Sequence, residues 1–181
     1  MKIAWGITGG GDKLLETVET LKNLKKEKKL IVEIYLSKAG YIVSKYYKIY
    51  EDLVASFDKV WIEKDANTPF LIGRLQMKEF DLLLIAPATS NTVAKIAVGI
   101  SDTLLSNAII QGIKGYVPVY IMPTDFREGE TVTVLPNGKT LRLRVRKEDV
   151  LNVRKLEEMD GISVLESPDK IKKALKNILV D

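Results

Sequence analysis

Short runs of aliphatic and β-branched residues recur along the chain, separated by segments with helical spacing. The runs that read as buried strands are residues 3–7, 31–36, 60–62, 82–86 and 117–122. Strands that alternate with helices are typical of successive βαβ units, whose strands lie parallel in one sheet. The pattern therefore predicts an α/β fold with a doubly wound parallel sheet, Rossmann-like or flavodoxin-like, and helices on both faces.

Two segments have the spacing of amphipathic helices, in which apolar residues recur every three or four positions. The apolar stripe of the first consists of Leu14, Leu15, Val18, Leu21 and Leu24. The second begins at Ser167 and Pro168, a pair typical of an N-cap and a first helical turn. Its apolar stripe consists of Ile171, Ala174, Leu175, Ile178 and Leu179.

One segment interrupts the alternation of strands and helices. Residues 131–135 and 140–145 alternate apolar and polar side chains around the turn sequence Pro136-Asn137-Gly138-Lys139. Asn and Gly tolerate the positive φ angles of a tight turn, so a β-hairpin is expected. We interpret it as an insertion near 131–146. The strand period of two would project Arg142, Arg144 and Arg146 from one face.

The chain of 181 residues is long enough for one sizeable core and contains no linker rich in proline or serine. We therefore expect a single domain over residues 1–181. No apolar run approaches the roughly 20 residues that span a bilayer, and no signal-peptide core follows Met1. A cytoplasmic protein without membrane contact is expected.

Histidine and cysteine are both absent from the sequence. Their absence excludes disulfides, a cysteine nucleophile, a Ser-His-Asp triad and a cysteine-ligated iron–sulfur cluster, and no metal site is expected. Any redox chemistry must then come from a bound cofactor. The net charge of +4 is spread over a chain with 24 acidic residues, so nucleic acid is not an expected partner.

The loop after the first predicted strand reads Gly6-Ile7-Thr8-Gly9-Gly10-Gly11-Asp12. Its small residues let backbone N–H groups approach an anion near a helix N-terminus. A P-loop would need Lys-Ser/Thr after Gly11, and a dinucleotide fingerprint would need glycine in place of Leu14. The loop therefore favours a mononucleotide phosphate, and the alternative is a tight strand-to-helix connection without a ligand.

The stretch after the predicted strand at 82–86 is rich in small polar residues. Pro87 is expected to end that strand. The side chains that follow it, Thr89, Ser90, Asn91 and Thr92, can hydrogen-bond a phosphate or the edge of a heteroaromatic ring. Any of them could instead cap the next helix. Ligands bind at the carboxyl ends of parallel strands, where this stretch and the glycine-rich loop both lie.

Several segments resemble, in order, motifs of the homo-oligomeric flavin-containing cysteine decarboxylase superfamily. Residues 6–9 are similar to its Gly-x-Thr/Ser-Gly turn, and residues 37–40 to its Thr-Lys-Ala-Ala segment. Residues 87–92 resemble its Pro-Ala-Ser-Ala-Asn-Thr motif, and residues 99–105 the motif Gly-Ile-Ala-Asp-Asn-Leu-Leu. Their common order and spacing are more specific than any one motif alone.

The resemblance implies FMN as cofactor and a homo-oligomer with the flavin near a subunit boundary. It places the phosphate at the turn from Thr8 to Gly10 and the flavin ring near Ser37, Pro87, Ala88 and Asn91. It also places Met122 close to the ring or the substrate. The cofactor-binding residues implied in this way are Thr8, Gly9, Gly10, Ser37, Lys38, Pro87, Ala88, Thr89, Ser90, Asn91, Thr92 and Met122.

Within the superfamily, the chain is similar over nearly its whole length to the archaeoflavoprotein branch, which includes dihydromethanopterin reductases. That branch implies an FMN protein that accepts electrons from a reduced carrier such as ferredoxin and passes them to a small acceptor, for example a dihydropterin. Relatives with their own cysteine-rich ferredoxin domain exist, so the donor here is expected to be a separate protein.

Other functions remain open from the sequence. Decarboxylases of the superfamily rely on histidine, which the chain lacks, but a flavin-dependent decarboxylase of a cysteine-derived substrate is one alternative. A non-catalytic flavin-binding module is another. The three hairpin arginines, or the lysines within residues 22–29, could dock an acidic ferredoxin, although such charges also serve as an ordinary solvated edge.

Overall fold

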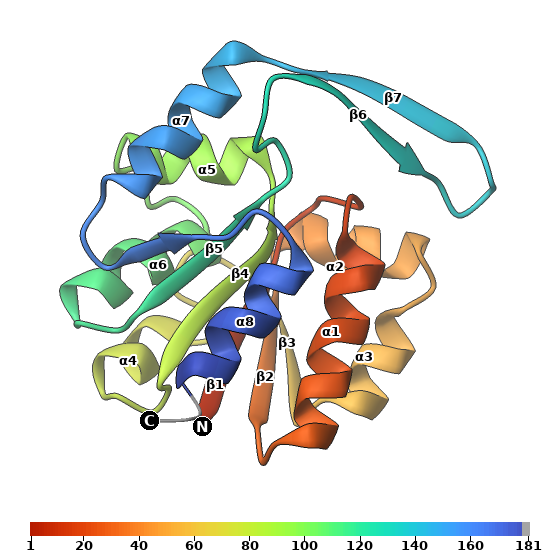
Figure 1. The fold of residues 1–181 in the computed structure, drawn as a ribbon. Helices are drawn as coiled ribbons and strands as arrows, with labels where there is room; N and C mark the ends of the chain where they lie inside the picture. Colours follow the sequence, from red (N-terminus) through yellow and green to blue (C-terminus); the bar gives the residue numbers. More distant parts are fainter. Residues whose placement is uncertain (179–181) are drawn as a thin grey trace.

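The structure, a computed structural model, describes residues 1–178 and is a three-layer α/β sandwich with a protruding hairpin (Figure 1). The strands of the main sheet are β1 (Lys2–Ile7), β2 (Ile31–Leu36), β3 (Lys59–Ile62), β4 (Leu82–Ala88), β5 (Val119–Pro123) and β8 (Ile162–Val164). All are parallel and lie in the order β3-β2-β1-β4-β5-β8. The predicted doubly wound sheet is confirmed, and its strand order is that of Rossmann folds.

Helices cover both faces of this sheet (Figure 1). They are α1 (Leu14–Glu27), α2 (Lys38–Tyr46), α3 (Tyr50–Ser56), α4 (Leu71–Gln76), α5 (Ser90–Ala97), α6 (Leu104–Lys114), α7 (Lys147–Glu157) and α8 (Pro168–Ile178). Side chains of α1, α3 and α8 pack into one core cluster, and those of α4 to α7 into the other. The central strands are buried on both faces, which explains their nearly continuous aliphatic sequences. Within residues 1–178, no helix is both long and apolar enough to cross a membrane.

The expected helix at the start of the chain is confirmed, with one exception in its stripe. Leu14, Val18, Leu21 and Leu24 are buried, but Leu15 is 49% exposed. A residue adjacent to Leu14 points about 100° away around a helix, so both cannot face the sheet. At the other end, Pro168 begins α8, whose Ile171 and Leu175 are buried, while Leu179 lies outside the described residues.

The strand boundaries differ from the predictions near two prolines. β4 continues through Pro87 to Ala88 instead of ending at 86, because its partner β5 resumes pairing beyond an irregularity, with Ala88 opposite Pro123. β5 begins at Val119, after Pro118, and not at 117. The short strand β8 was missed, since three residues are too few for a periodic signal.

The predicted hairpin is present as β6 (Gly129–Val134) and β7 (Thr140–Val145), which form a separate antiparallel ribbon. It extends from the body above α1 and α2 (Figure 1). The expectation that three arginines share one face is wrong for Arg146. That residue follows β7 as the N-cap of α7, where its guanidinium lies 2.6 Å from a carboxylate oxygen of Asp149.

Candidate functional site

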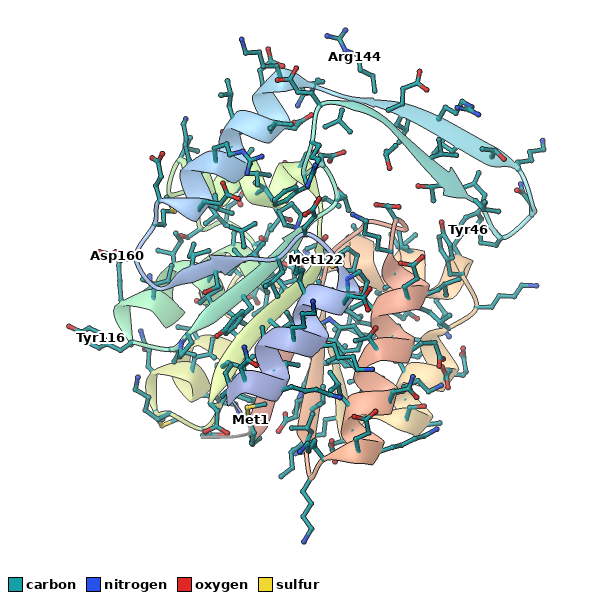
Figure 2. The ribbon with its side chains drawn as sticks, in the orientation of Figure 1. Met1, Tyr46, Tyr116, Met122, Arg144 and Asp160 are labelled. Carbon is teal, nitrogen blue, oxygen red and sulfur yellow. The ribbon has the colours of Figure 1, made fainter. Side chains whose placement is uncertain are left out.

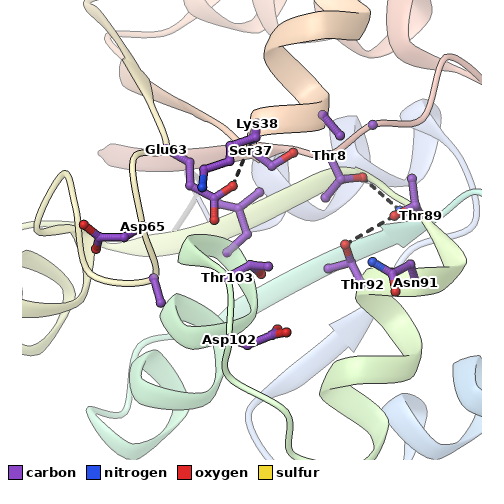
Figure 3. Close-up of a pocket in the computed structure, with 14 residues that line it drawn as sticks. Thr8, Ser37, Lys38, Glu63, Asp65, Thr89, Asn91, Thr92, Asp102 and Thr103 are labelled. Atoms are coloured by element: carbon purple, nitrogen blue, oxygen red, sulfur yellow. Dashed lines mark hydrogen bonds between the residues drawn. The ribbon is translucent and has the colours of Figure 1, made fainter.

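A cavity of about 390 Å³ opens at the carboxyl edge of the sheet, where β1 lies between β2 and β4 (Figure 3). The helix after β1 covers one face and the helix after β4 covers the other, so their loops separate and leave a crevice. The residues that line it are Thr8, Gly9, Ser37, Lys38, Ala39, Glu63, Asp65, Ala66, Thr89, Asn91, Thr92, Asp102, Thr103 and Leu105. We call this the switch-point cavity.

Thr8 ties the loop after β1 to the loop after β4. Its hydroxyl donates a hydrogen bond to the Pro87 carbonyl at 2.8 Å and accepts one from the Thr89 amide at 2.9 Å. Its own amide also donates to the Pro87 carbonyl. Because the only proton of the hydroxyl is used in this way, Thr8 positions the two loops and has none to give a phosphate.

The N-terminus of α2 enters the cavity beside the end of β1. Ser37 is its N-cap and accepts a hydrogen bond from the Gly40 amide at 2.9 Å, which leaves the hydroxyl proton of Ser37 for another partner. A Cβ at Gly40 would collide with the Ile7 carbonyl, and a Cβ at Gly9 would lie 2.7 Å from that of Ala39. Glycine at both positions thus lets the positive end of the helix dipole approach the glycine-rich loop.

Each acidic side chain around the cavity already has partners in the protein. Glu63 accepts hydrogen bonds from the amides of Lys38 and Leu104, at 2.9 and 2.7 Å, and so joins the N-termini of α2 and α6. Asp65 accepts from the amides of the turn that follows it, which lowers its pKa. Lys95 holds the pKa of Asp102 below its usual range through a hydrogen bond of 2.7 Å.

The groups of the cavity that remain available as hydrogen-bond donors suit an anion. Among the described residues, Lys38 is the only basic side chain of the lining. The hydroxyl groups of Thr89 and Thr92 lie 3.3 Å apart, and either can turn its proton towards a ligand. With the acids paired, the hydroxyl proton of Ser37 and the side chain of Lys38, beside the positive end of the α2 dipole, form a site suited to a phosphate group.

A second cavity, of about 350 Å³, lies beneath the hairpin and shares Gly9 and Thr89 with the first. Its remaining lining residues are Gly10, Gly11, Asp12, Val43, Tyr46, Tyr47, Ser90, Thr124, Asp125, Thr131, Thr133, Leu135, Leu141 and Leu143. We call this the hairpin chamber. Tyr46 and Tyr47 form part of its wall, whereas Tyr41 and Tyr50 pack against each other at a centroid distance of 5.1 Å.

The residues implied by the resemblance divide into three groups. Those that line the switch-point cavity are Thr8, Gly9, Ser37, Lys38, Thr89, Asn91 and Thr92. Gly10 and Ser90 line the hairpin chamber instead. Pro87, Ala88 and Met122 are buried in their strands and line neither cavity. Thr89 occupies the N-cap position of α5, as the capping alternative expects, but its side chain makes no capping hydrogen bond.

Sequence reasoning missed the acidic part of the site. Glu63 directly follows the predicted third strand, so its place at the carboxyl edge of the sheet was available as a signal. Asp65 and Ala66 lie in a loop without a recognisable motif. Asp102 and Thr103 lie within the segment 99–105 that resembles a superfamily motif, but no site residue was predicted from that segment; Thr103 is the N-cap of α6.

Comparison with known proteins identifies close relatives. The family model described as Flavoprotein matches residues 1–175. An uncharacterised protein of Methanocaldococcus jannaschii is 52% identical over 181 residues, covering 99% of this chain and 97% of that protein. A dihydromethanopterin reductase (acceptor) of the same organism is 31% identical over 231 residues, covering 94% of each chain.

A solved structure has the same fold over nearly the whole chain. It is DmrB of Burkholderia xenovorans in complex with FMN, described as a cubic protein cage for redox transfer. Its sequence is 31% identical, the TM-score is 0.85, and the match covers 99% of this chain and 95% of that one. Flavin-dependent cysteine decarboxylases share the fold at lower identity, for example the peptidyl-cysteine decarboxylase EpiD at 19% with a TM-score of 0.65.

Proposed function

The chain belongs to the Flavoprotein family, and from that premise we propose that it binds FMN and carries electrons from a reduced carrier to a small acceptor. The observation that carries the proposal is the switch-point cavity, which Ser37 and Lys38 line at the N-terminus of α2. A phosphate ester is the group that such a site recognises. The Burkholderia relative, similar over almost the whole chain, contains FMN.

The phosphate would be held by Gly9, Ser37, Lys38, Thr89 and Thr92, which line one cavity. Glu63 and Thr8 would position these groups without binding the phosphate, because their hydrogen bonds fix the loops that carry the phosphate donors.

The flavin ring would extend along the boundary of the two cavities. Gly10 and Ser90 line the hairpin chamber next to the shared residues Gly9 and Thr89, and Asn91 lines the switch-point cavity. The floor beneath the ring would be supported from within the core by Pro87, Ala88 and Met122. When bound, the flavin supplies the electron acceptance and release that the side chains of this chain cannot. The contribution of the protein is to orient one face of the ring and to limit its contact with water.

The electron donor would be a separate acidic carrier such as ferredoxin. Arg142 and Arg144 lie on the exposed hairpin, where the guanidinium of Arg142 is 3.6 Å from a carboxylate oxygen of Glu130. Long-range attraction to such a surface accelerates the encounter of oppositely charged proteins. We further propose a cytoplasmic single domain over residues 1–181 that assembles into a homo-oligomer with the flavin near a subunit boundary, by analogy with the cage of the Burkholderia relative.

A small acceptor is proposed because relatives include a dihydromethanopterin reductase (acceptor), which makes a dihydropterin the leading candidate. A decarboxylase is less well supported, since the histidine on which that branch relies is missing from the sequence. Release of carbon dioxide from a cysteine-derived substrate would revive that alternative.

The visible absorption spectrum of the purified protein, with identification of the released cofactor, tests the proposal. Bound FMN is expected, followed by rapid anaerobic bleaching when reduced ferredoxin is added. The variant Lys38→Gln should weaken FMN binding about tenfold, the typical value of one charge-assisted hydrogen bond. Lys29→Gln, which removes an equal charge from an exposed position far from the cavity, should leave the affinity unchanged.

Three outcomes would contradict parts of this proposal. A colourless protein that takes up no FMN would refute it altogether. Bound FMN that no carrier reduces would indicate a non-catalytic flavin module. Equal FMN affinities of Lys38→Gln and Lys29→Gln would mean that the phosphate does not bind at the N-terminus of α2.

A further inference from the structure

The hairpin has two different faces, and the face that covers the chamber is the uncharged one. Directly paired residues of an antiparallel ribbon share a face. Thr131 pairs with Leu143 and Thr133 with Leu141, and all four line the chamber. Figure 2 shows the side chain of Arg144 directed away from the body, on the opposite face. The hairpin thus places apolar groups over the chamber and its arginines in solvent.

The chamber walls favour a flat, largely apolar ligand. Leu135, Leu141 and Leu143 stand on one side, and Val43, Tyr46 and Tyr47 on the other. In Figure 2, Tyr46 lies beneath the end of the hairpin, and its side chain is about half exposed, as is that of Leu143. Aliphatic and aromatic walls around a few polar groups are typical of small-molecule sites.

The two charged side chains of the chamber, those of Asp12 and Asp125, are acceptors of hydrogen bonds, whereas its Ser, Thr and Tyr hydroxyls can donate as well as accept. One carboxylate oxygen of Asp12, Oδ2, is buried and has no hydrogen-bond partner among the described residues. Buried polar atoms are nearly always paired, so a turn of the Asp12 side chain that brings Oδ2 to an N–H group of a ligand in the chamber would supply the missing partner. Burial is also the main cause that raises the pKa of Asp12, opposed by Lys13 and supported by Glu16 and Asp125.

Asp125 adds a second carboxylate, held by a hydrogen bond of 2.9 Å from the hydroxyl of Thr124. No lysine or arginine among the described residues lines the chamber. An anionic ligand would therefore meet two carboxylates and no compensating cation, which is unfavourable in a partly dry site. A neutral or cationic ligand with N–H donors would meet complementary groups.

We propose that the hairpin chamber is the acceptor site and that Asp12 selects a planar heteroaromatic molecule presenting adjacent N–H donors, such as the 2-amino-pyrimidinone edge of a pterin. This inference rests on the proposed function, because the chamber adjoins the switch-point cavity through Gly9 and Thr89. That contact lets a ligand of the chamber lie beside a flavin in the first cavity. Asp12 acts here as a specificity-determining residue.

Equilibrium dialysis of pterin and of lumazine against the FMN-loaded protein tests the inference. Lumazine has an oxygen acceptor in place of the 2-amino donor of pterin, so it should bind about tenfold to hundredfold more weakly, the range expected for hydrogen bonds to a charged group. The isosteric variant Asp12→Asn should lose this preference. Asp160→Asn, which removes an equal charge from an exposed position outside both cavities, should retain it.

A variant of the wall separates packing from recognition. Leu141→Ala should weaken the binding of pterin and of lumazine by a similar factor and leave the ratio of the two affinities unchanged, since it removes apolar contact only. FMN affinity, measured on the same samples, should not change in Asp12→Asn. Equal binding of the two probes by the wild-type protein, or an unchanged ratio in Asp12→Asn, would overturn the inference.

The two proposals fail in different ways. If the protein takes up no FMN, the proposed function fails, and the same dialysis on the FMN-free protein still measures the preference for pterin. If FMN binds and the preference is absent, only the role of Asp12 fails.

Discussion

Glu33 is the centre of a buried ion-pair network whose contribution to stability can be tested by acid. It lies in β2 with only 4% of its side chain exposed. Arg74 binds both of its carboxylate oxygens, at 2.7 and 2.9 Å, and Trp61 and Lys2 bind at 3.0 and 3.1 Å. These partners, led by Arg74, lower the pKa of Glu33 from 4.5 to about 2 against the opposing effect of burial.

The direction of the pH effect follows from that difference. In the unfolded chain Glu33 takes up a proton near pH 4.5, whereas in the folded protein it resists protonation down to about pH 2. The stabilisation is therefore fully present above pH 4.5 and is lost as the pH falls towards 2. At about 1.4 kcal/mol for each tenfold change in a protonation constant, the pKa difference is worth about 3 kcal/mol of unfolding free energy at neutral pH.

Urea unfolding of the wild-type protein and of Glu33→Gln, repeated between pH 2 and 7, measures this contribution. The variant keeps the shape of the side chain but removes the buried carboxylate that Arg74 binds, so it should be less stable by about 3 kcal/mol at pH 7. The difference should shrink to near zero at pH 2. Glu79→Gln is a matched control, because Glu79 binds the same arginine from an exposed position and should cost under about 1 kcal/mol.

Other carboxylates also titrate in this range, so the decisive quantity is the difference between the two proteins and not the slope of either one. A difference that stays constant from pH 2 to 7 would refute the argument. It would mean that Arg74 stabilises the neutral and the charged side chain equally.

Three further perturbations have expected outcomes. Gly40→Ala should push the start of α2 away from the Ile7 carbonyl, and so weaken FMN binding and lower the unfolding free energy by about 1–3 kcal/mol. The control is Gly73→Ala, which has open space at its Cβ and should not destabilise the protein in urea unfolding. Glu63→Gln should lower the unfolding free energy by about 1–3 kcal/mol and weaken FMN binding, because one of the two amides loses its acceptor and the other keeps only a neutral one. Burial raises the pKa of the Tyr35 phenol, so alkaline titration followed at 295 nm should show the same transitions in Tyr35→Phe until the protein unfolds.

The sheet was predictable because its central strands are buried on both faces and therefore read as aliphatic runs. The hairpin was predictable for another reason, since Asn137 and Gly138 mark a turn between alternating segments. Neither signal extends to strand ends. β4 continues through Pro87 because β5 offers a pairing partner beyond it, and that partner is a property of the sheet and not of the local sequence.

Motif positions predicted which loops meet but not what each side chain does there. Thr8 occupies the place of a phosphate-binding hydroxyl, yet its proton is donated to the Pro87 carbonyl of a strand that lies far away in the sequence. The resemblance places Met122 near the ring or the substrate, yet its side chain is buried in the core. Such roles depend on which atoms are within hydrogen-bond distance, and only the folded chain determines that.

At the carboxyl edge of the sheet, hydrogen bonds join loops and helix ends that belong to different βα units. Thr8, at the end of β1, bonds the loop after β4, and Glu63, after β3, bonds the first amides of α2 and α6. Helix N-termini have unsatisfied amides, so an internal carboxylate at two of them fixes their relative position without engaging the hydroxyl proton of Ser37 or the side chain of Lys38. Ser37 and Lys38 are therefore presented to a ligand by groups that need not touch it. This arrangement explains why motif residues and residues outside the motifs should affect the same binding constant.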